Sequence, residues 1–213
     1  MDKHSGKSCC CFVSRKSDLA FKVTELVTQL SAAGFLTKYL QCNNTGVNAK
    51  GLSVLCTKFN IQMEMSAPYT PQQNGIVECI FVMICNQSGA TMIKAKLSDE
   101  NQRLLWTESV HTSTRLANIV SNTKDDKCLD EMFYGKRPAI YKHLIQIGSV
   151  GYMKIGKKQN KLEPKAVQSV MIGYAANQPG DTYRMYNIDT KEWITAATYS
   201  GQTGMALQHL AIT

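Results

Sequence analysis

The hydrophobic pattern of the chain changes period once, and this change limits the folds open to it. Apolar residues recur every three or four positions over about residues 18–34, 48–59 and 99–121. From about residue 143 onward, short apolar stretches alternate with turn residues instead. Helical spacing followed by closely spaced short strands predicts an α/β part and then a small all-β part.

Strands are predicted in both parts. Ile61, Met63 and Met65 alternate with polar residues, which is typical of a half-buried strand, and residues 35–42 and 12–16 are predicted as a second strand and as the end of a third. The all-β part is predicted to hold five strands, at residues 144–147, 150–155, 167–174, 182–187 and 193–197. Short strands at this spacing favour a small barrel or curled sheet.

Composition narrows the class of protein. The chain has 213 residues, of which 44% are hydrophobic and 19% charged, so a folded protein is expected rather than a disordered one. A net charge of +8 suits a polyanionic partner, nucleic acid first. The sequence contains no run of 18 or more apolar residues, so no membrane span is predicted. Residues 1–11 lack the apolar core of a secretory signal.

The cysteines point to an intracellular protein. Eight are present, but no C-x-x-C pair occurs, and the four histidines match no zinc spacing. Together with the missing signal, this predicts reduced thiols and a location in the cytoplasm or nucleus.

One loop carries a highly specific pattern. It contains two prolines and an Asn-Gly pair, and it reads Ser66-Ala67-Pro68-Tyr69-Thr70-Pro71-Gln72-Gln73-Asn74-Gly75-Ile76-Val77-Glu78. This block closely resembles the S-A-P-Y-T-P-Q-Q-N-G signature of integrases from copia-type retrotransposons. The stretch 130–138 is similar to that family's F-E-x-x-Y-G-K-x-P connector, and residues 143–187 are similar to the SH3-like domain that follows the integrase core.

The resemblance implies a fold and a domain plan. The fold class is α/β: an RNase H-like mixed sheet with flanking helices, followed by a small all-β SH3-like barrel. Residues 1–122 would form the core, with its first strand truncated, and residues 123–142 the connector. Residues 143–200 would form the SH3-like domain, and residues 201–213 a tail.

The family's activity is metal-dependent strand transfer of DNA, carried by three carboxylates that hold two Mg²⁺ or Mn²⁺ ions. By resemblance the third acidic position falls on Glu78, and the second on Asn43 in the segment Leu40-Gln41-Cys42-Asn43-Asn44-Thr45-Gly46. The first falls on Asp2, although a plain N-terminal acidic residue explains Asp2 equally well. Asp2 and Glu78 would be the metal ligands. For Glu78 alone, an acidic residue favoured by the helix dipole is the competing interpretation.

Two departures predict that the chain is catalytically inactive. Asn43 replaces an aspartate, and an amide brings no negative charge to a metal. After Glu78 the family carries a basic run that faces DNA, whereas this chain has Cys79-Ile80-Phe81-Val82. That apolar run removes phosphate contacts and predicts an exposed sticky patch. Any bound metal is therefore expected to be weakly held or absent.

The densest basic cluster lies in the all-β part. Lys154, Lys157, Lys158, Lys161 and Lys165 gather around one predicted turn, which would either follow a phosphate backbone or form a solvated hairpin. Tyr174, Tyr183 and Tyr186 are predicted as barrel core, with base stacking as the alternative. Leu105 and Trp106 are predicted as core residues of a helix.

The sequence leaves three functional hypotheses. The first is an integrase core fragment that is inactive as written. The second is a non-catalytic module, derived from a transposon, that binds nucleic acid or another protein. The third is a decayed fragment without function. The expected partner of the chain is DNA, bound weakly and without sequence preference. No membrane partner is expected, and an oligomer is compatible with the sequence.

Overall fold

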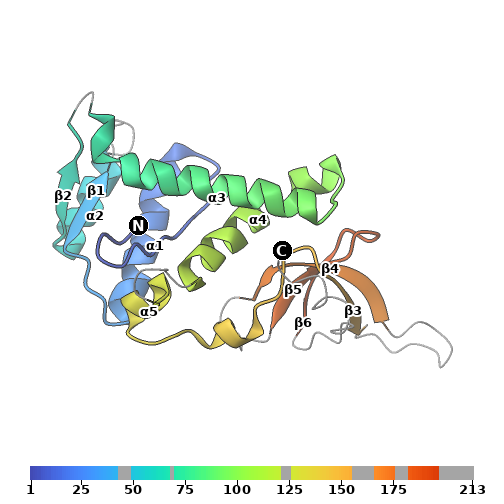
Figure 1. The fold of residues 1–213 in the computed structure, drawn as a ribbon. Coiled ribbons are helices and arrows are strands. Elements are labelled where there is room, and N and C mark those ends of the chain that lie inside the picture. The colour runs from blue at the N-terminus through green and yellow to red at the C-terminus, as the bar shows by residue number, and fades with distance from the viewer. Residues whose placement is uncertain (43–48, 68–69, 121–125, 155–165, 176–181, 197–213) are drawn as a thin grey trace. The chain divides into compact units, whose positions relative to one another are not determined.

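The structure is a computed structural model that describes residues 1–42, 49–67, 70–120, 126–154, 166–175 and 182–196 (Figure 1). The chain separates into two compact units. The first unit consists of Cys11–Val82, and the second of Met1–Cys10 together with Met83–Thr213. The boundary falls inside a helix, α3, that continues unbroken from one unit into the next. The sequence-based domain boundaries at residues 122 and 142 remain a prediction.

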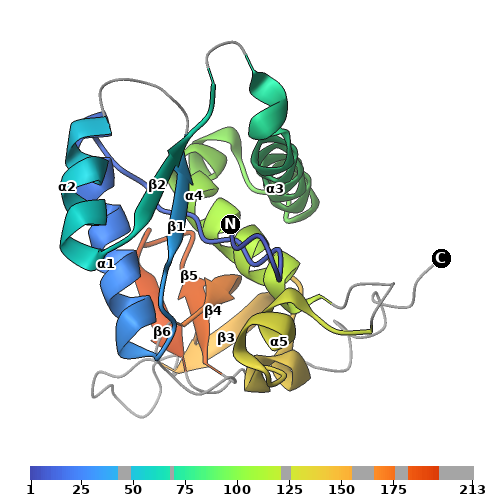
Figure 2. The same cartoon turned by 90° about the vertical axis from the view of Figure 1, so that its left-hand side faces the viewer.

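The Cys11–Val82 unit holds two helices and a pair of parallel strands. Its elements are a short 3₁₀ turn at Lys16–Asp18, α1 (Leu19–Ala32), β1 (Tyr39–Cys42), α2 (Ala49–Phe59), β2 (Gln62–Met65) and a second 3₁₀ turn at Pro71–Gln73. The two helices lie on one side of the strand pair (Figure 2). The predicted helices and the strands at 35–42 and 61–65 are thus confirmed within a few residues.

The core of this unit comes from the apolar positions that the helical and strand spacing picked out. Val27, Leu55, Cys56 and Ile61 are buried, and Leu40 and Met63 pack against them from β1 and β2. Residues one step along each strand point the other way. On that opposite face Tyr39 pairs with Gln62 and Gln41 with Glu64, so it is polar. An RNase H-like sheet, covered on both faces, stays unconfirmed.

The strand predicted to end near residue 16 does not form. Residues 1–16 contain no strand, and Lys16–Asp18 is already the turn that leads into α1. The N-terminal segment folds as a tight turn instead and docks on helix α4 (Asp99–Ile119). There Asn118 accepts a hydrogen bond from the Ser8 amide at 2.9 Å and donates one to the Ser8 carbonyl at 2.7 Å.

The second unit holds a four-stranded antiparallel sheet. After α3 (Gly75–Lys94) and α4 come α5 (Leu129–Tyr134), a 3₁₀ turn at Ala139–His143, β3 (Val150–Lys154), β4 (Ala166–Tyr174), β5 (Tyr183–Tyr186) and β6 (Trp193–Ala196). The strands pair in chain order. Four of the five predicted strands are confirmed, but residues 144–147 form no strand. Within the described residues β3 and β6 do not pair, so a closed barrel is not confirmed.

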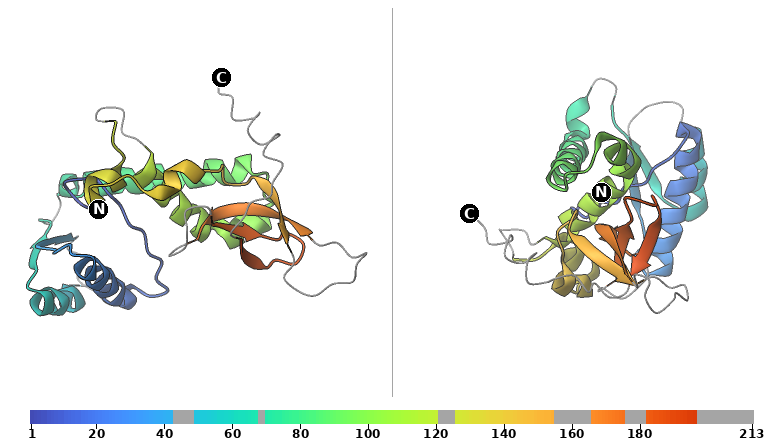
Figure 3. Two further views of the ribbon diagram at one scale, coloured as in Figure 1. Left: turned by 90° about the horizontal axis from the view of Figure 1, so that it is seen from below. Right: turned by 90° about the vertical axis from the view of Figure 1, so that its right-hand side faces the viewer.

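Helix α4 packs directly on β4, one of the two inner strands of the sheet (Figure 3). The Thr112 hydroxyl donates a hydrogen bond to the Ile172 carbonyl at 3.0 Å. A Cβ atom at Gly173 would lie 2.6 Å from the same hydroxyl oxygen, so the close approach depends on glycine there. Leu105 of α4 is buried with Ile172 and Tyr186. The sheet therefore shares its core with a helix that the sequence assigned to the other part.

Single-residue burial corrects the expectation for Trp106 and confirms those for Leu105 and the three tyrosines. Leu105 is 1% exposed, as predicted, but its neighbour Trp106 is 49% exposed and is not a core residue. Tyr174, Tyr183 and Tyr186 are all buried to 5% exposure or less, so they belong to the core and cannot stack on bases. The Tyr174 hydroxyl donates to the Ile145 carbonyl at 2.8 Å and accepts from its amide at 3.1 Å.

Candidate functional site

The carboxyl ends of β1 and β2 form the framework of the candidate site. Because the strands are parallel, Cys42 and Met65 end side by side at the same edge. The Ser66 amide extends this pairing by donating to the Cys42 carbonyl at 3.0 Å. The signature loop therefore leaves β2 next to the point where β1 ends, which is the position immediately before Asn43.

Gln73 ties the signature loop back to these strand ends. Its side-chain oxygen accepts a hydrogen bond from the Ala67 amide at 2.9 Å, and its carbonyl accepts one from the Gln41 side chain at 3.4 Å. Thr70 adds a hydroxyl bond to the Ala67 carbonyl at 2.5 Å. The sequence analysis did not assign roles to Gln41 or Gln73. The only available signal was the position of Gln73 inside the signature block.

Glu78 lies in the first turn of α3, directly after this loop. Its amide donates to the Asn74 carbonyl at 3.1 Å, so the helix has begun at this point, and its side chain is exposed. A carboxylate in a first turn is favoured by the helix dipole. The structure thus presents Glu78 to solvent at the end of a loop that is anchored to β1.

The other predicted positions are not brought together with Glu78 by any described contact. Asn43 lies outside the described residues. Asp2 belongs to the second unit, and one of its carboxylate oxygens accepts hydrogen bonds from the Ser5 amide and the Ser5 hydroxyl, both at 2.7 Å. Burial alone would raise the pKa of Asp2, but these two bonds and the nearby His4 outweigh it and lower the pKa. The carboxylate therefore stabilises its own turn.

The residues that the structure describes do not form a two-metal centre. Among the residues that the structure describes, no three His, Cys, Asp or Glu side chains gather closely enough to hold a metal ion. Burial raises the pKa of the Cys42 thiol at the end of β1, so it stays neutral and is a poor metal ligand. Residue 43, which the resemblance predicts as the second carboxylate position, is an asparagine. We therefore derive no chemical step that passes through a metal.

The predicted basic turn is mostly outside the described part of the chain. The backbone of Lys154 ends β3 and pairs with Ala166, while Lys157, Lys158, Lys161 and Lys165 are not described. Elsewhere in the second unit, Arg184 is paired with Glu108 and lies 5.4 Å from the ring of Trp193. Its charge is already balanced, so it adds little to a basic surface.

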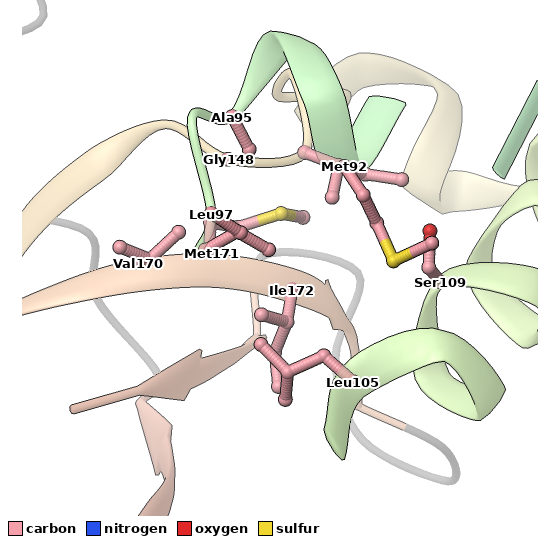
Figure 4. Close-up of a pocket in the computed structure, with 10 residues that line it drawn as sticks. Met92, Ala95, Leu97, Leu105, Ser109, Gly148, Val170, Met171 and Ile172 are labelled. Atoms are coloured by element: carbon pink, nitrogen blue, oxygen red, sulfur yellow. The ribbon is translucent and has the colours of Figure 1, made fainter. Parts of the chain in front are cut away.

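A small cavity in the second unit does not offer an alternative site (Figure 4). Its volume is about 10 Å³, and Met92, Leu105, Met171 and Ile172 are among the mostly apolar residues that line it. A space of this size holds one water molecule at most. It is a packing gap between α3, α4 and the sheet.

By length and composition, α3 could cross a membrane. One helix of this kind is weak support for a membrane protein. The run Cys79–Val82 within it contains Phe81 at 66% and Val82 at 55% exposure, which confirms the predicted apolar patch.

A comparison with known protein sequences finds a similar polyprotein from a transposon. The chain is 25% identical over 180 residues to the Retrovirus-related Pol polyprotein from transposon TNT 1-94 of Nicotiana tabacum. This match covers 83% of the chain but 13% of the polyprotein, so the chain spans a small part of that relative. No protein-family profile matches the chain.

The fold is similar to that of one chain in the cryo-EM structure of the simian T-cell lymphotropic virus intasome in complex with PP2A regulatory subunit B56 gamma. The TM-score is 0.50 at 13% identity, and the match covers 94% of this chain and 68% of that chain. Together the two likenesses support a retroelement, integrase-like origin. The copia type, the RNase H-like core and the SH3-like barrel remain predictions.

Proposed function

We propose that this protein is a piece of a retroelement integrase that binds DNA through charge and does not catalyse strand transfer. The observation that carries the proposal is the signature loop, which is anchored to β1 by Gln41 and Gln73 and presents Glu78 at the start of α3. The resemblance of residues 66–78 to an integrase signature and the two likenesses described above support it. An intracellular location, in the cytoplasm or nucleus, belongs to the same proposal.

The loss of catalysis follows from the donor set. Two divalent cations need several negative ligands around them, and the position that should supply one of these carries Asn43. Mg²⁺ or Mn²⁺ would at best be held weakly by Glu78 and water. Removing an anionic ligand of a catalytic metal forfeits several kcal/mol of transition-state stabilisation.

The catalytic half of the proposal is tested by end joining. Purified protein at high concentration is incubated with a donor duplex and a target, with Mg²⁺ and separately with Mn²⁺, and we expect no joined product. Asn43→Asp should not restore full activity, because the Asp2 carboxylate remains engaged with Ser5. Metal-dependent product that disappears in Glu78→Gln would overturn this half.

The binding half is tested by the salt dependence of DNA affinity. Contacts to three to five phosphates give a slope of about −3 to −5 in a plot of log affinity against log salt, at roughly −0.9 per phosphate. Replacing Lys157, Lys158 and Lys161 by Gln should flatten the slope by about two to three, equally for all DNA sequences. The matched control removes the same charge from α1 and α2, at Lys22, Lys50 and Lys58. An equal effect of both triple variants would refute the assigned surface.

A second candidate function rests on the exposed apolar residues of α3. A module that binds a protein rather than DNA would need such a surface, and Ile76, Phe81 and Ile93 are each more than 60% exposed. DNA affinity with no salt dependence, or none at all, would favour this function or a decayed fragment.

A further inference from the structure

The signature loop ends in a dipeptide whose two residues can react with each other. Asn74-Gly75 is the only Asn-Gly pair among the 213 residues. The side chain of an asparagine is an amide, and the backbone nitrogen of the next residue can attack its carbonyl carbon. Glycine hinders this attack least, because it has no side chain and its backbone adopts more conformations than that of other residues.

The structure leaves the attacking nitrogen of Gly75 unpaired and uncrowded. Gly75 is the first residue of α3, so its amide belongs to the N-terminal donors that have no partner within the helix. Among the described residues, no hydrogen bond is made by this amide or by the side chain of the half-buried Asn74. Apart from the neighbouring backbone, no atom lies within 4 Å of the place where a Cβ atom of Gly75 would stand. The two groups can therefore meet without first breaking a hydrogen bond.

Asn60 provides a contrast within the same unit. It is exposed, whereas Asn74 is half-buried, but the residue that follows it is Ile61, a branched residue that is 7% exposed. The Ile61 amide is also engaged, because it donates a hydrogen bond to the Cys56 carbonyl at 2.8 Å. Exposure would select Asn60 as the reactive asparagine, whereas the free and unhindered amide selects Asn74.

We propose that Asn74 is a site of spontaneous deamidation, which converts it to aspartate or isoaspartate one turn before Glu78. The Gly75 nitrogen bonds to the side-chain carbonyl carbon of Asn74. The side-chain nitrogen then leaves as ammonia, together with the amide proton of Gly75. Water opens the resulting cyclic imide: opening at the side-chain carbonyl gives aspartate, and opening at the backbone carbonyl gives isoaspartate. Water is the only co-reactant.

The conversion falls between two residues of the candidate site. Gln73 is bonded to Ala67 and Gln41, and the Glu78 amide donates to the Asn74 carbonyl at 3.1 Å. Aspartate keeps this backbone and adds a second carboxylate on the helix face that carries Glu78. Isoaspartate instead adds a methylene group to the backbone between the bonded Gln73 and Glu78. The carbonyl that holds the Glu78 amide then changes position, so the first turn of α3 should loosen.

The first experiment follows the purified full chain through a time course in neutral buffer at body temperature. Peptide mass spectrometry detects the exchange of side-chain nitrogen for oxygen, and fragmentation of the peptide locates it. We expect conversion at Asn74 to be at least ~10-fold faster than at Asn60, a difference of about 1.4 kcal/mol in activation free energy. No conversion at Asn74, or equal rates at both residues, would overturn the proposal.

Two comparisons test whether the fold leaves this pair reactive. Gly75→Ala should slow the conversion of Asn74 at least ~10-fold, and its added Cβ atom has open space, so the fold should be kept. The second comparison needs no variant: unfolding the unchanged chain in urea should accelerate the conversion of Asn74 by less than ~10-fold. An unaltered rate in Gly75→Ala, or a much larger acceleration in urea, would refute the proposed role of the free amide.

The second experiment examines the consequence for Glu78. Aged protein is separated into its aspartate and isoaspartate forms, and amide exchange over residues 75–78 is measured. The isoaspartate form should exchange at least ~10-fold faster than the fresh chain, whereas the matched variant Asn74→Asp should exchange like it. Equal exchange in all forms would contradict the effect on the first turn. Neither experiment involves DNA or catalysis, so the proposed function stands or falls separately.

Discussion

At the scale of single residues, the tightest constraint in the second unit is Gly148. Its φ of +86° lies in the left-handed region, and a Cβ atom would come within 2.3 Å of the Ala95 Cβ. Its amide also donates to the Met171 carbonyl at 2.7 Å, so the backbone cannot easily move away. Conformation and packing therefore both require glycine at this position.

We expect Gly148→Ala to lower the free energy of unfolding by about 2–5 kcal/mol, the sum of backbone strain and overpacking. Gly135→Ala separates the two causes. Gly135 also has a positive φ, of +73°, but nothing lies within 4 Å of its added Cβ. That variant should lose only the strain, about 1–2 kcal/mol. Equal losses in denaturant unfolding would show that the contact with Ala95 is not limiting.

Tyr174 makes the stability of the second unit sensitive to alkaline pH. Burial raises its pKa to about 12, against the lowering effect of its bond to Ile145. The folded state therefore keeps a proton that the unfolded state loses above its ordinary pKa of about 10. Stability is intact below pH 10 and falls by about 1.4 kcal/mol per pH unit as pH rises towards 12.

The measurement is chemical denaturation at several pH values between 9 and 12, with phenolate absorbance as a second readout. Tyr174→Phe should be less stable at pH 8, since it leaves Ile145 without its partner, but its decline above pH 10 should be shallower. An identical decline in both proteins would assign the alkaline loss to lysines instead.

At the scale of elements, helix α4 supplies part of the core on which the four-stranded sheet packs. Thr112 bonds to β4, and Leu105 fills a cluster with Ile172 and Tyr186. Arg115 adds hydrogen bonds to the carbonyls of Tyr174 and Ala175 at 3.4 and 3.3 Å. The all-β segment alone would leave these surfaces bare, so it should not be an autonomous domain.

Two neighbouring leucines on α4 test this. Leu105→Ala removes a side chain that is 1% exposed and should cost about 2–5 kcal/mol, with faster amide exchange in β4 and β5. Leu104 is 50% exposed, and Leu104→Ala should change stability by less than ~0.5 kcal/mol. Unchanged exchange in the strands after Leu105→Ala would show that the sheet holds together without the helix.

Most of the predicted helices and strands are confirmed, and the failures are short segments. Helices α1, α2 and α4 were recognised because apolar residues recur at helical spacing along each of them, although most of the residues that α4 buries are Ser, Thr and Asn. The strand expected at 144–147 has only four residues, and Gly148, with its left-handed backbone, follows it directly. So short a pattern cannot distinguish a strand from a buried irregular segment.

At the scale of the whole molecule, the two units have separate cores. One is built around Leu55, Cys56 and Val27, and the other around residues such as Met171, Ile119 and Met185. Because the two cores share no residues, a substitution in one core should not change the loss of stability caused by a substitution in the other.

We therefore expect Leu55→Ala to accelerate amide exchange within residues 11–82, while Leu105→Ala should do so within residues 83–196. The losses of stability in the double variant should add to within about 0.5 kcal/mol. Hydrogen exchange followed by mass spectrometry checks both statements. A Leu55→Ala effect that spreads through the sheet would mean that the protein unfolds as one cooperative unit.

The sequence by itself determined what local chemistry dictates: the helical and strand periods, the proline-rich loop that ends at Glu78, and the neutral amide at position 43. Only the tertiary structure decided which neighbours are buried. Leu105 and Trp106 both look like core residues on a helix, but one side chain points into the sheet and the other does not. It also decided that α4 packs on β4 and that few residues of α3 are buried. A residue's period records which face it occupies, whereas only packing decides whether that face is covered.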